Sequence, residues 1–151
     1  MAIKQKTVMT IKLSGEGTSH SRTVVSTDGQ QVVIDEPLAR GGTDEGPTPT
    51  ATAYAALVGC TNVIGHKCAN KLDIDIGHLQ FTMEVDFDRR GVLLMEEVDI
   101  PFKAIRLDVV SDGPCSAEEL TRVGDETAKY CAIAKLFQQS GTDLNVSWRK
   151  I

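Results

Sequence analysis

The sequence predicts an α+β fold, a mostly antiparallel sheet with two long helices, in one domain that spans residues 1–151. Three observations lead to this class. Alternating polar and apolar runs, typical of strands, come in two groups of three, and one long helical pattern follows each group before a last strand. Parallel βαβ units would need strands and helices to alternate regularly, which they do not. A length of 151 residues fits one domain and is enough for a core without disulfide bonds.

The first group of predicted strands comprises residues 5–13, 22–26 and 31–34. The last two are joined through Asp28-Gly29, a dipeptide that favours the tight turn of a β-hairpin. Residues 36–47, EPLARGGTDEGP, follow this group and are rich in glycine, proline and charge. We therefore expect a loop there.

The first long helix is expected to begin after Thr48 and to end near Lys71. Threonine can cap a helix, and Pro49 suits the first helical position because an N–H there has no partner within the helix. One predicted face follows helical spacing and comprises Ala53, Ala56, Leu57, Cys60, Val63 and Ile64. Gly59 and Gly65 each cost about 1 kcal/mol relative to alanine. Together with the alanines they would let another backbone approach closely, so we expect a tightly packed central helix.

The second half of the chain repeats this order. Its predicted strands are residues 73–88, 92–97 and 101–110, with a closing strand at 144–149. Ser116 and Glu119 have the spacing of a capping box, so a second long helix is expected to start there and to run to about Gln139. One face of this helix carries Leu120, Val123, Thr127, Cys131 and Ala134. It therefore presents a cysteine to the core, as the first helix does.

Composition and charge exclude several classes of function. The net charge is −5 and the sequence has no cluster of lysine and arginine, which argues against nucleic-acid binding. The N-terminus lacks the apolar run of a signal peptide, and no run approaches the roughly 18 apolar residues of a membrane span. We therefore expect a cytoplasmic protein that does not enter a membrane. The glycine-rich loop lacks the lysine of a phosphate-binding P-loop, so nucleotide binding is not expected.

Of the four cysteines, Cys60 and Cys131 each lie on the inward face of a predicted helix among small side chains. One interpretation is a pair of buried core thiols, because reduced cysteines are by default small core residues. The other is a redox pair, in which one thiolate attacks an oxidant, becomes a sulfenic acid and forms a disulfide with the second thiol. Apolar surroundings would select apolar oxidants and raise the pKa of the attacking thiol, so a nearby cation or hydrogen-bond donor would be needed.

A metal site built from Cys60, His66 and Cys68 is not expected. Positions 66 and 68 point about 200° apart on a helix of 3.6 residues per turn, so they cannot share one ion unaided. Cys68 and Cys115 are expected to be packed thiols without a redox role, and Trp148 is expected to anchor the core or an interface.

Two segments, GPTPTATAYAALVGC at residues 46–60 and AKYCAIAKLF at residues 128–137, are similar to motifs of the OsmC/Ohr family. This family comprises osmotically inducible protein C and the organic hydroperoxide resistance proteins. In it, a glycine-rich loop leads through a Gly-Pro-[Ser/Thr]-Pro-like turn into a central helix that carries the first cysteine. A second helix carries the second cysteine. The order of predicted strands and helices agrees with this family along the whole chain.

The resemblance implies an OsmC-like fold that assembles as an intertwined homodimer, with the long helices packed centrally and two active sites at the interface. It implies a thiol-dependent peroxidase that reduces organic hydroperoxides, with Cys60 at the peroxidatic position and Cys131 at the resolving position. A dithiol, notably a lipoylated protein, is the implied reductant, and no metal or organic cofactor is expected. The alternative is a non-enzymatic dimer of this fold that binds a small apolar ligand or senses oxidants slowly. A purely structural dimer is the third possibility.

The sequence departs from the family at the first turn of the central helix. Active members commonly place a glutamate there, where this chain has Thr50 and Ala51. This absence favours the non-enzymatic alternative, whereas the two cysteines favour the peroxidase. The loop acids Asp44 and Glu45 are candidates to replace the missing carboxylate.

The family's glutamate orients an arginine that activates the first cysteine. Arg40, just before Gly41 in the glycine-rich loop, is the arginine that we assign to the site from the sequence, and Arg22 is the other candidate. A smaller departure is Ala132, after the second cysteine, where many relatives have proline.

Overall fold

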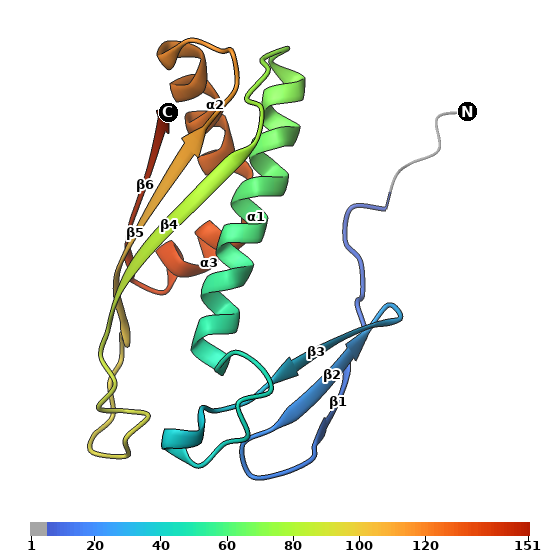
Figure 1. Ribbon diagram of the computed structural model, residues 1–151, viewed down its shortest axis with the longest axis vertical. Helices are drawn as coiled ribbons and strands as arrows, with labels where there is room; N and C mark the ends of the chain where they lie inside the picture. The colour runs from blue at the N-terminus through green and yellow to red at the C-terminus, as the bar shows by residue number, and fades with distance from the viewer. Residues whose placement is uncertain (1–5) are drawn as a thin grey trace. The chain divides into compact units, whose positions relative to one another are not determined.

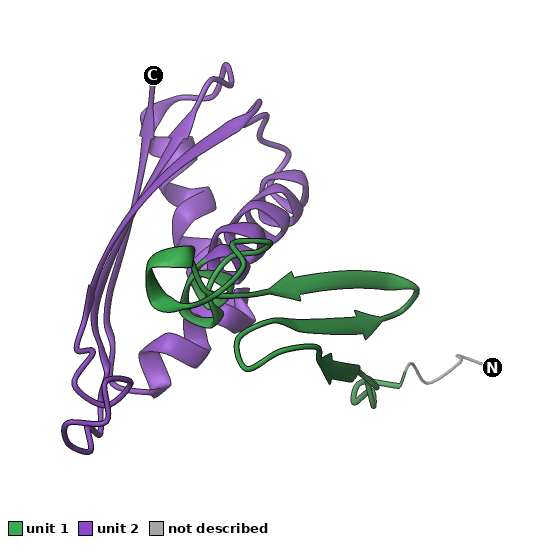
Figure 2. Cartoon of the chain, turned by 60° about the horizontal axis from the view of Figure 1, so that its bottom comes forward, with its two compact units in different colours: residues 1–54 green, residues 55–151 purple. Residues whose placement is uncertain are grey.

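A computed structural model describes residues 6–151. The chain divides into two compact units, Met1–Tyr54 and Ala55–Ile151 (Figure 2). The helix α1, Pro49–Lys71, begins in unit 1 and continues in unit 2.

Unit 1 contains an antiparallel sheet of three short strands, β1 (Ser14–Gly17), β2 (Thr23–Thr27) and β3 (Gln30–Ile34). The predicted hairpin is confirmed: Asp28 and Gly29 both have positive φ angles, 47° and 76°, as a tight two-residue turn requires. The predicted strand at residues 5–13 is wrong for residues 6–13, which pair with no strand in the described chain, and residue 5 lies outside it. Their alternation of polar and apolar residues predicts a strand but does not supply a neighbour to pair with.

The loop after β3 is built around a buried carboxylate. Asp35 accepts hydrogen bonds from the backbone N–H groups of Glu36, Thr43 and Glu45 and from the hydroxyl of Thr43. These bonds, the Thr43 hydroxyl first, hold the pKa of Asp35 far below its ordinary value although burial acts to raise it. The loop also includes the short helix η1, Leu38–Arg40. Gly42 permits its tight path, because a Cβ there would lie 1.8 Å from the carbonyl oxygen of Glu36.

Helix α1 begins as predicted, with the Thr48 hydroxyl accepting a hydrogen bond from the N–H of Ala51 at 3.2 Å. Its buried residues are Leu57, Thr61, Gly65, Cys68 and Ala69. The predicted face is therefore only partly right, since Val63 is 52% exposed and Ala56 is exposed as well. Gly65 lies on the face that is buried. It contacts the indole of Trp148 and not the backbone of another helix, and a Cβ there would lie 2.8 Å from that ring.

Unit 2 contains one sheet of order β4-β5-β6, formed by Leu79–Phe87, Phe102–Ser111 and Asp143–Lys150. β4 and β5 are antiparallel, but β5 and β6 are parallel, so this sheet is mixed, while the pairings of the two sheets together are mostly antiparallel, as predicted. The parallel pair is joined by a helical crossover, as parallel strands require. The predicted strand at residues 92–97 is absent, because this segment lies in a connection whose chain folds back through turns around Arg90 and its partners Asp88 and Glu96.

The crossover consists of two helices, α2 (Ala117–Tyr130) and α3 (Ala132–Gln139), and not the one long helix predicted from 116 to about 139. The capping box of Ser116 and Glu119 is confirmed. The break falls on Cys131, whose backbone is extended with φ −70° and ψ 105°. Cys131 is therefore at a helix junction and not in mid-helix.

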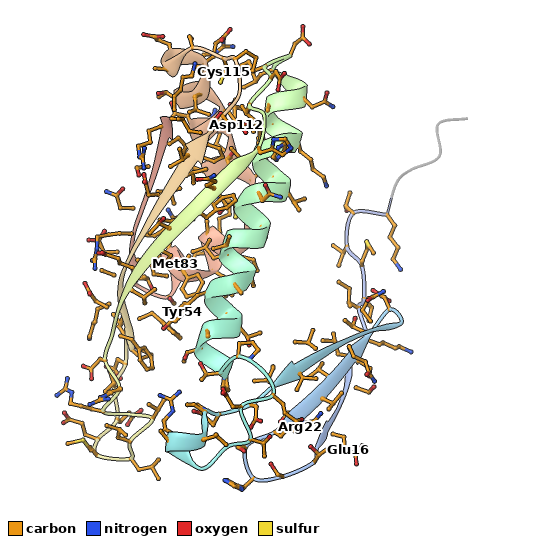
Figure 3. The ribbon with its side chains drawn as sticks, in the orientation of Figure 1. Glu16, Arg22, Tyr54, Met83, Asp112 and Cys115 are labelled. Carbon is orange, nitrogen blue, oxygen red and sulfur yellow. The ribbon has the colours of Figure 1, made fainter. Side chains whose placement is uncertain are left out.

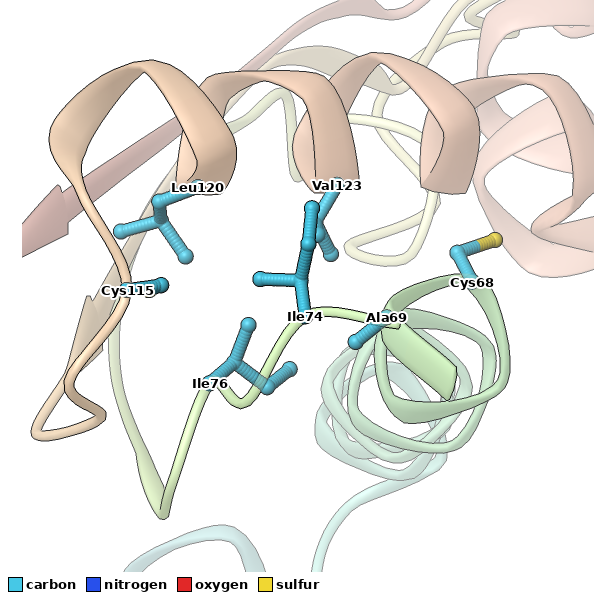
Figure 4. Packing of buried hydrophobic residues seen from close by; sticks show 7 residues of the cluster. All are labelled: Cys68, Ala69, Ile74, Ile76, Cys115, Leu120 and Val123. Atoms are coloured by element: carbon cyan, nitrogen blue, oxygen red, sulfur yellow. The ribbon is translucent and has the colours of Figure 1, made fainter. Parts of the chain in front are cut away.

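The helices of unit 2 cover one face of its sheet (Figure 1). Between them lies a core cluster of Cys68, Ala69, Ile74, Ile76, Cys115, Leu120 and Val123, shown in Figure 4. The opposite face is polar, with exposed ion pairs from Arg106 to Glu84 and Asp86. The core therefore lies on the helix side of the sheet, where both candidate thiols are also found.

Candidate functional site

Cys131 occupies the junction between α2 and α3 and is 1% exposed. Its own N–H donates to the carbonyl of Thr127 at 2.9 Å and so completes α2. Its Sγ accepts a hydrogen bond from the N–H of Ala134 at 3.4 Å and so caps α3. The following residue, Ala132, is the first of α3, a position that proline would also suit.

Cys60 lies on α1 and is half-buried. Its thiol is within hydrogen-bonding reach of the Cys131 thiol, so the fold brings together the two cysteines that the sequence singled out. Burial raises the pKa of Cys131 most, and the hydrogen bond to Cys60 raises it further; the N–H of Ala134 acts in the opposite direction. The pair is thus unequal: Cys131 is enclosed and holds its proton strongly, whereas Cys60 is the more accessible thiol.

A cavity of about 200 Å³ lies beside Cys131, between α1, α2, α3 and β6. Its lining includes Thr61, Gly124, Ala134 and Trp148. The Trp148 indole also packs on Gly124, where a Cβ would lie 2.7 Å from the ring. Trp148 is therefore an anchor of this core, as expected, and two helix glycines make room for it. Sequence reasoning missed this use of the glycines, although glycine inside a helix is itself a signal of close packing.

Both arginine candidates belong to unit 1, whereas both thiols belong to unit 2. Arg40 ends η1, is 60% exposed and pairs with Glu36, with its Nε 2.6 Å from the carboxylate. Arg22, labelled in Figure 3, is 26% exposed; its Nε donates to Glu45 and its Nη1 donates to the hydroxyl of Thr18 at 3.0 Å. Arg22 is thus the arginine that a carboxylate and a hydroxyl hold in place.

The first turn of α1 has no acidic residue, in agreement with the sequence. Hydroxyl groups occupy this position: the Oγ1 atoms of Thr48 and Thr50 are 3.2 Å apart, and Thr50 also hydrogen-bonds to Tyr54. Burial raises the pKa of Tyr54, and the bond to Thr50 partly offsets this effect. The place of the family's carboxylate is therefore filled by neutral groups.

Core packing and backbone contacts surround the remaining candidates. Cys68 and Cys115 are buried in the core cluster, as expected. The imidazole nitrogens of His66 lie 3.0 and 3.1 Å from the carbonyl oxygens of Asn62 and Gly77. Within residues 6–151, no three histidine, cysteine or acidic side chains are grouped so that they could hold a metal ion. None of the helices in this part of the chain is both long and apolar enough to cross a membrane.

Comparisons with known proteins agree with this α+β fold. A family model described as OsmC-like protein matches residues 42–147. A comparison with curated proteins gives no match. Among solved structures, an OsmC-like protein from Mycoplasma pneumoniae is similar, with a TM-score of 0.75 and 19% identity over 93% of this chain and 98% of that one.

Two further solved structures are named as organic hydroperoxide resistance proteins. The one from Legionella pneumophila has a TM-score of 0.68 and 18% identity, and the one from Elizabethkingia anophelis has 0.72 and 16%. Each alignment covers 97% of this chain and 100% of the other. At these identities the likeness shows a shared fold: a mixed α+β architecture with two sheets and three α-helices.

Proposed function

Because this chain belongs to the OsmC-like protein family, we propose that it reduces organic hydroperoxides, with Cys60 as the attacking thiol and Cys131 as the resolving thiol. Relatives of the same fold that are named for organic hydroperoxide resistance support this substrate class. The observation that carries the proposal is the proximity of these two thiols in unequal environments.

The two thiols differ in exposure, and this difference suits one attacking and one resolving thiol. A peroxide must reach the attacking sulfur, and Cys60 is the more exposed of the two. The resolving thiol needs no access to substrate, and Cys131 is enclosed and has a raised pKa. A protonated Cys131 can donate its hydrogen bond to a thiolate on Cys60 and so favour the charged form of the nucleophile.

The proposed reaction has three steps. The Cys60 thiolate attacks one oxygen of the hydroperoxide, the O–O bond breaks, and the products are a sulfenic acid on Cys60 and, after protonation, an alcohol. The thiol of Cys131 then attacks the sulfenic sulfur, which releases water and leaves a Cys60–Cys131 disulfide. A dithiol such as a lipoylated protein reduces this disulfide through a mixed disulfide and is itself oxidised.

The proposal includes an arginine that favours the thiolate. Arg40 is the candidate from the sequence, but its high exposure and its pairing with Glu36 resemble an ordinary surface ion pair. The bonds from Arg22 to Glu45 and Thr18 give Arg22 the stronger structural case. In this proposal Glu45 takes the part of the glutamate that is absent from positions 50 and 51.

The proposal also includes a homodimer. Apolar side chains are exposed at two places: on residues 6–13, at Val8, Ile11 and Leu13, and on α1 at Val63. A run of exposed apolar residues, such as Val8, Ile11 and Leu13, is typical of an interaction site. A second copy of the chain that pairs with the N-terminal segment and packs on α1 would cover both.

The test is to trap the sulfenic acid. In Cys131→Ser, one equivalent of cumene hydroperoxide is expected to give one turnover and a dimedone adduct on Cys60, because no thiol resolves the intermediate. Cys60→Ser is expected to consume no peroxide. Cys68→Ser and Cys115→Ser are matched controls that should keep the wild-type rate. Peroxide consumption that survives in Cys60→Ser would refute the assignment.

The absence of an acid from the first turn of α1 favours a second candidate, a non-enzymatic protein that binds a small ligand. The cavity of about 200 Å³ beside Cys131 offers space for one. A thiol pair that reacts with cumene hydroperoxide no faster than free cysteine does would favour this candidate over the peroxidase.

A further inference from the structure

A second hollow lies in unit 2 on the surface between α1 and α2. It has a volume of about 360 Å³ and is lined by Ile64, Lys67, Cys68, Lys71 and Tyr130. Three of these residues are apolar or aromatic, and the two lysines have long aliphatic stems. Long lysine side chains commonly lie along apolar surface while their amino groups stay in water.

The helices that form this groove also carry or adjoin the two candidate thiols, although neither thiol lines the groove itself. Cys60, Ile64, Lys67 and Lys71 recur at intervals of four, three and four residues, so they form one stripe along α1. Lys67 is seven residues from Cys60, which is roughly 10 Å along a helix axis. On the α2 side, Tyr130 immediately precedes Cys131. The groove is thus a separate hollow from the cavity beside Cys131, and two of its five lining residues are lysines.

Lysines outnumber carboxylates around this groove. Lys71 and Lys129 share one carboxylate, Glu126, and Lys71 also lies over the Tyr130 ring at 5.2 Å. The bonds to Lys129 and Lys71 lower the pKa of Glu126, so it stays ionised at neutral pH. Lys67 has no carboxylate partner within residues 6–151. Two lysines therefore line the groove, and the carboxylate that pairs with one of them is shared with a third lysine, in a protein whose net charge is −5.

We propose that this groove binds an amphiphile that carries one carboxylate on an apolar chain, with the carboxylate at Lys67 and Lys71 and the chain along Ile64 and Tyr130. The surplus of positive charge favours an anion over a neutral or cationic ligand of the same shape. The apolar walls favour a chain over a small inorganic anion. Binding involves no redox step, so it does not depend on the proposed peroxidase reaction.

The experiment is isothermal titration of the protein with three probes of equal chain length: dodecanoate, its methyl ester and dodecyltrimethylammonium. Dodecanoate is expected to bind and the other two to bind at least about tenfold more weakly. One exposed ion pair changes affinity by at most about fivefold. Lys67→Gln/Lys71→Gln removes two lysines, so it should weaken dodecanoate binding by about tenfold. Tyr130→Ala should weaken dodecanoate and its ester alike, because it removes apolar contact from both.

The matched control is Lys12→Gln/Lys135→Gln, which removes the same charge at exposed positions outside the groove and should leave affinity unchanged. An equal loss in this control would replace the proposed site by a general electrostatic effect. Equal affinity for the ester would refute recognition of the carboxylate. Binding to anionic phosphatidylglycerol vesicles without binding to dodecanoate would identify a lipid surface as the partner and overturn the proposal. Thermal melts of each variant exclude unfolding as the cause.

Discussion

At the scale of single residues, the proposed reaction depends most on the environment of Cys131. This residue ends one helix and caps the next, so its sulfur has a fixed place at the junction. Its burial and its contact with Cys60 both raise its pKa. The division into an accessible thiol and an enclosed one therefore follows from backbone geometry.

The first prediction at this scale concerns which arginine, Arg22 or Arg40, favours the Cys60 thiolate. Arg22→Gln is expected to lower the second-order rate with cumene hydroperoxide by at least about tenfold, because loss of a preorganised donor at a charged centre is costly. Arg40→Gln is expected to lower it by no more than about twofold. Stopped-flow measurement of both rates decides between them. A larger loss in Arg40→Gln would return the role to the arginine assigned from the sequence.

The second prediction at this scale concerns how the buried carboxylate of Asp35 makes stability depend on pH. Its pKa in the folded protein lies below its ordinary value of 3.8, so its contribution to stability is complete above that value and is lost as the pH falls below it. Denaturant midpoints measured between pH 7 and pH 3 should therefore fall less steeply at the acidic end in Asp35→Asn than in the wild type, with Asp44→Asn as the control. Parallel curves for Asp35→Asn and the wild type would contradict this role.

Sequence reasoning identified both thiols, but it could not establish their proximity, because two helices far apart in the chain carry them. Asp35 was missed because three of the four hydrogen bonds described for it come from backbone N–H groups, which leave no mark in a residue pattern. The surplus of lysines near Tyr130 was missed for a related reason: α1 and α2 each supply part of it.

At the scale of elements, capped helices and the tight hairpin were predicted reliably because local chemistry determines them. Thr48, Ser116 and Asp28-Gly29 each satisfy a local rule of capping or turn geometry. Strands at residues 6–13 and 92–97 were predicted wrongly, since alternation describes the faces of a strand and not its partner. The second long helix was predicted to continue because nothing in the local sequence marks Cys131 as a break.

The packing of Trp148 between two helices gives an element-scale prediction. Gly65→Ala and Gly124→Ala should each destabilise the protein by about 1–3 kcal/mol, because a new methyl group would overlap the indole. Trp148 is the one tryptophan of the chain, so its fluorescence should also shift. Asp125→Ala, at the exposed position next to Gly124, is the control and should change stability by no more than about 0.5 kcal/mol. Unchanged stability in both glycine variants would contradict this packing.

At the scale of the whole molecule, exposed apolar residues on α1 and on residues 6–13 support the proposed homodimer. Val63→Arg should weaken the dimer by at least about tenfold, because a charge would be buried at the interface. Gln80→Arg, at an exposed position of β4, adds the same charge and should leave assembly unchanged. Sedimentation velocity over a range of concentrations measures both. A wild-type protein that is monomeric throughout this range would rule out the dimer.

The most direct measurement for the central claim is the intact mass of the wild-type protein after one equivalent of cumene hydroperoxide, followed by peptide mapping. The account predicts rapid loss of two hydrogen atoms, mapped to a Cys60–Cys131 disulfide and faster than with hydrogen peroxide. An unchanged mass, or slow oxidation spread over all four cysteines, would contradict it.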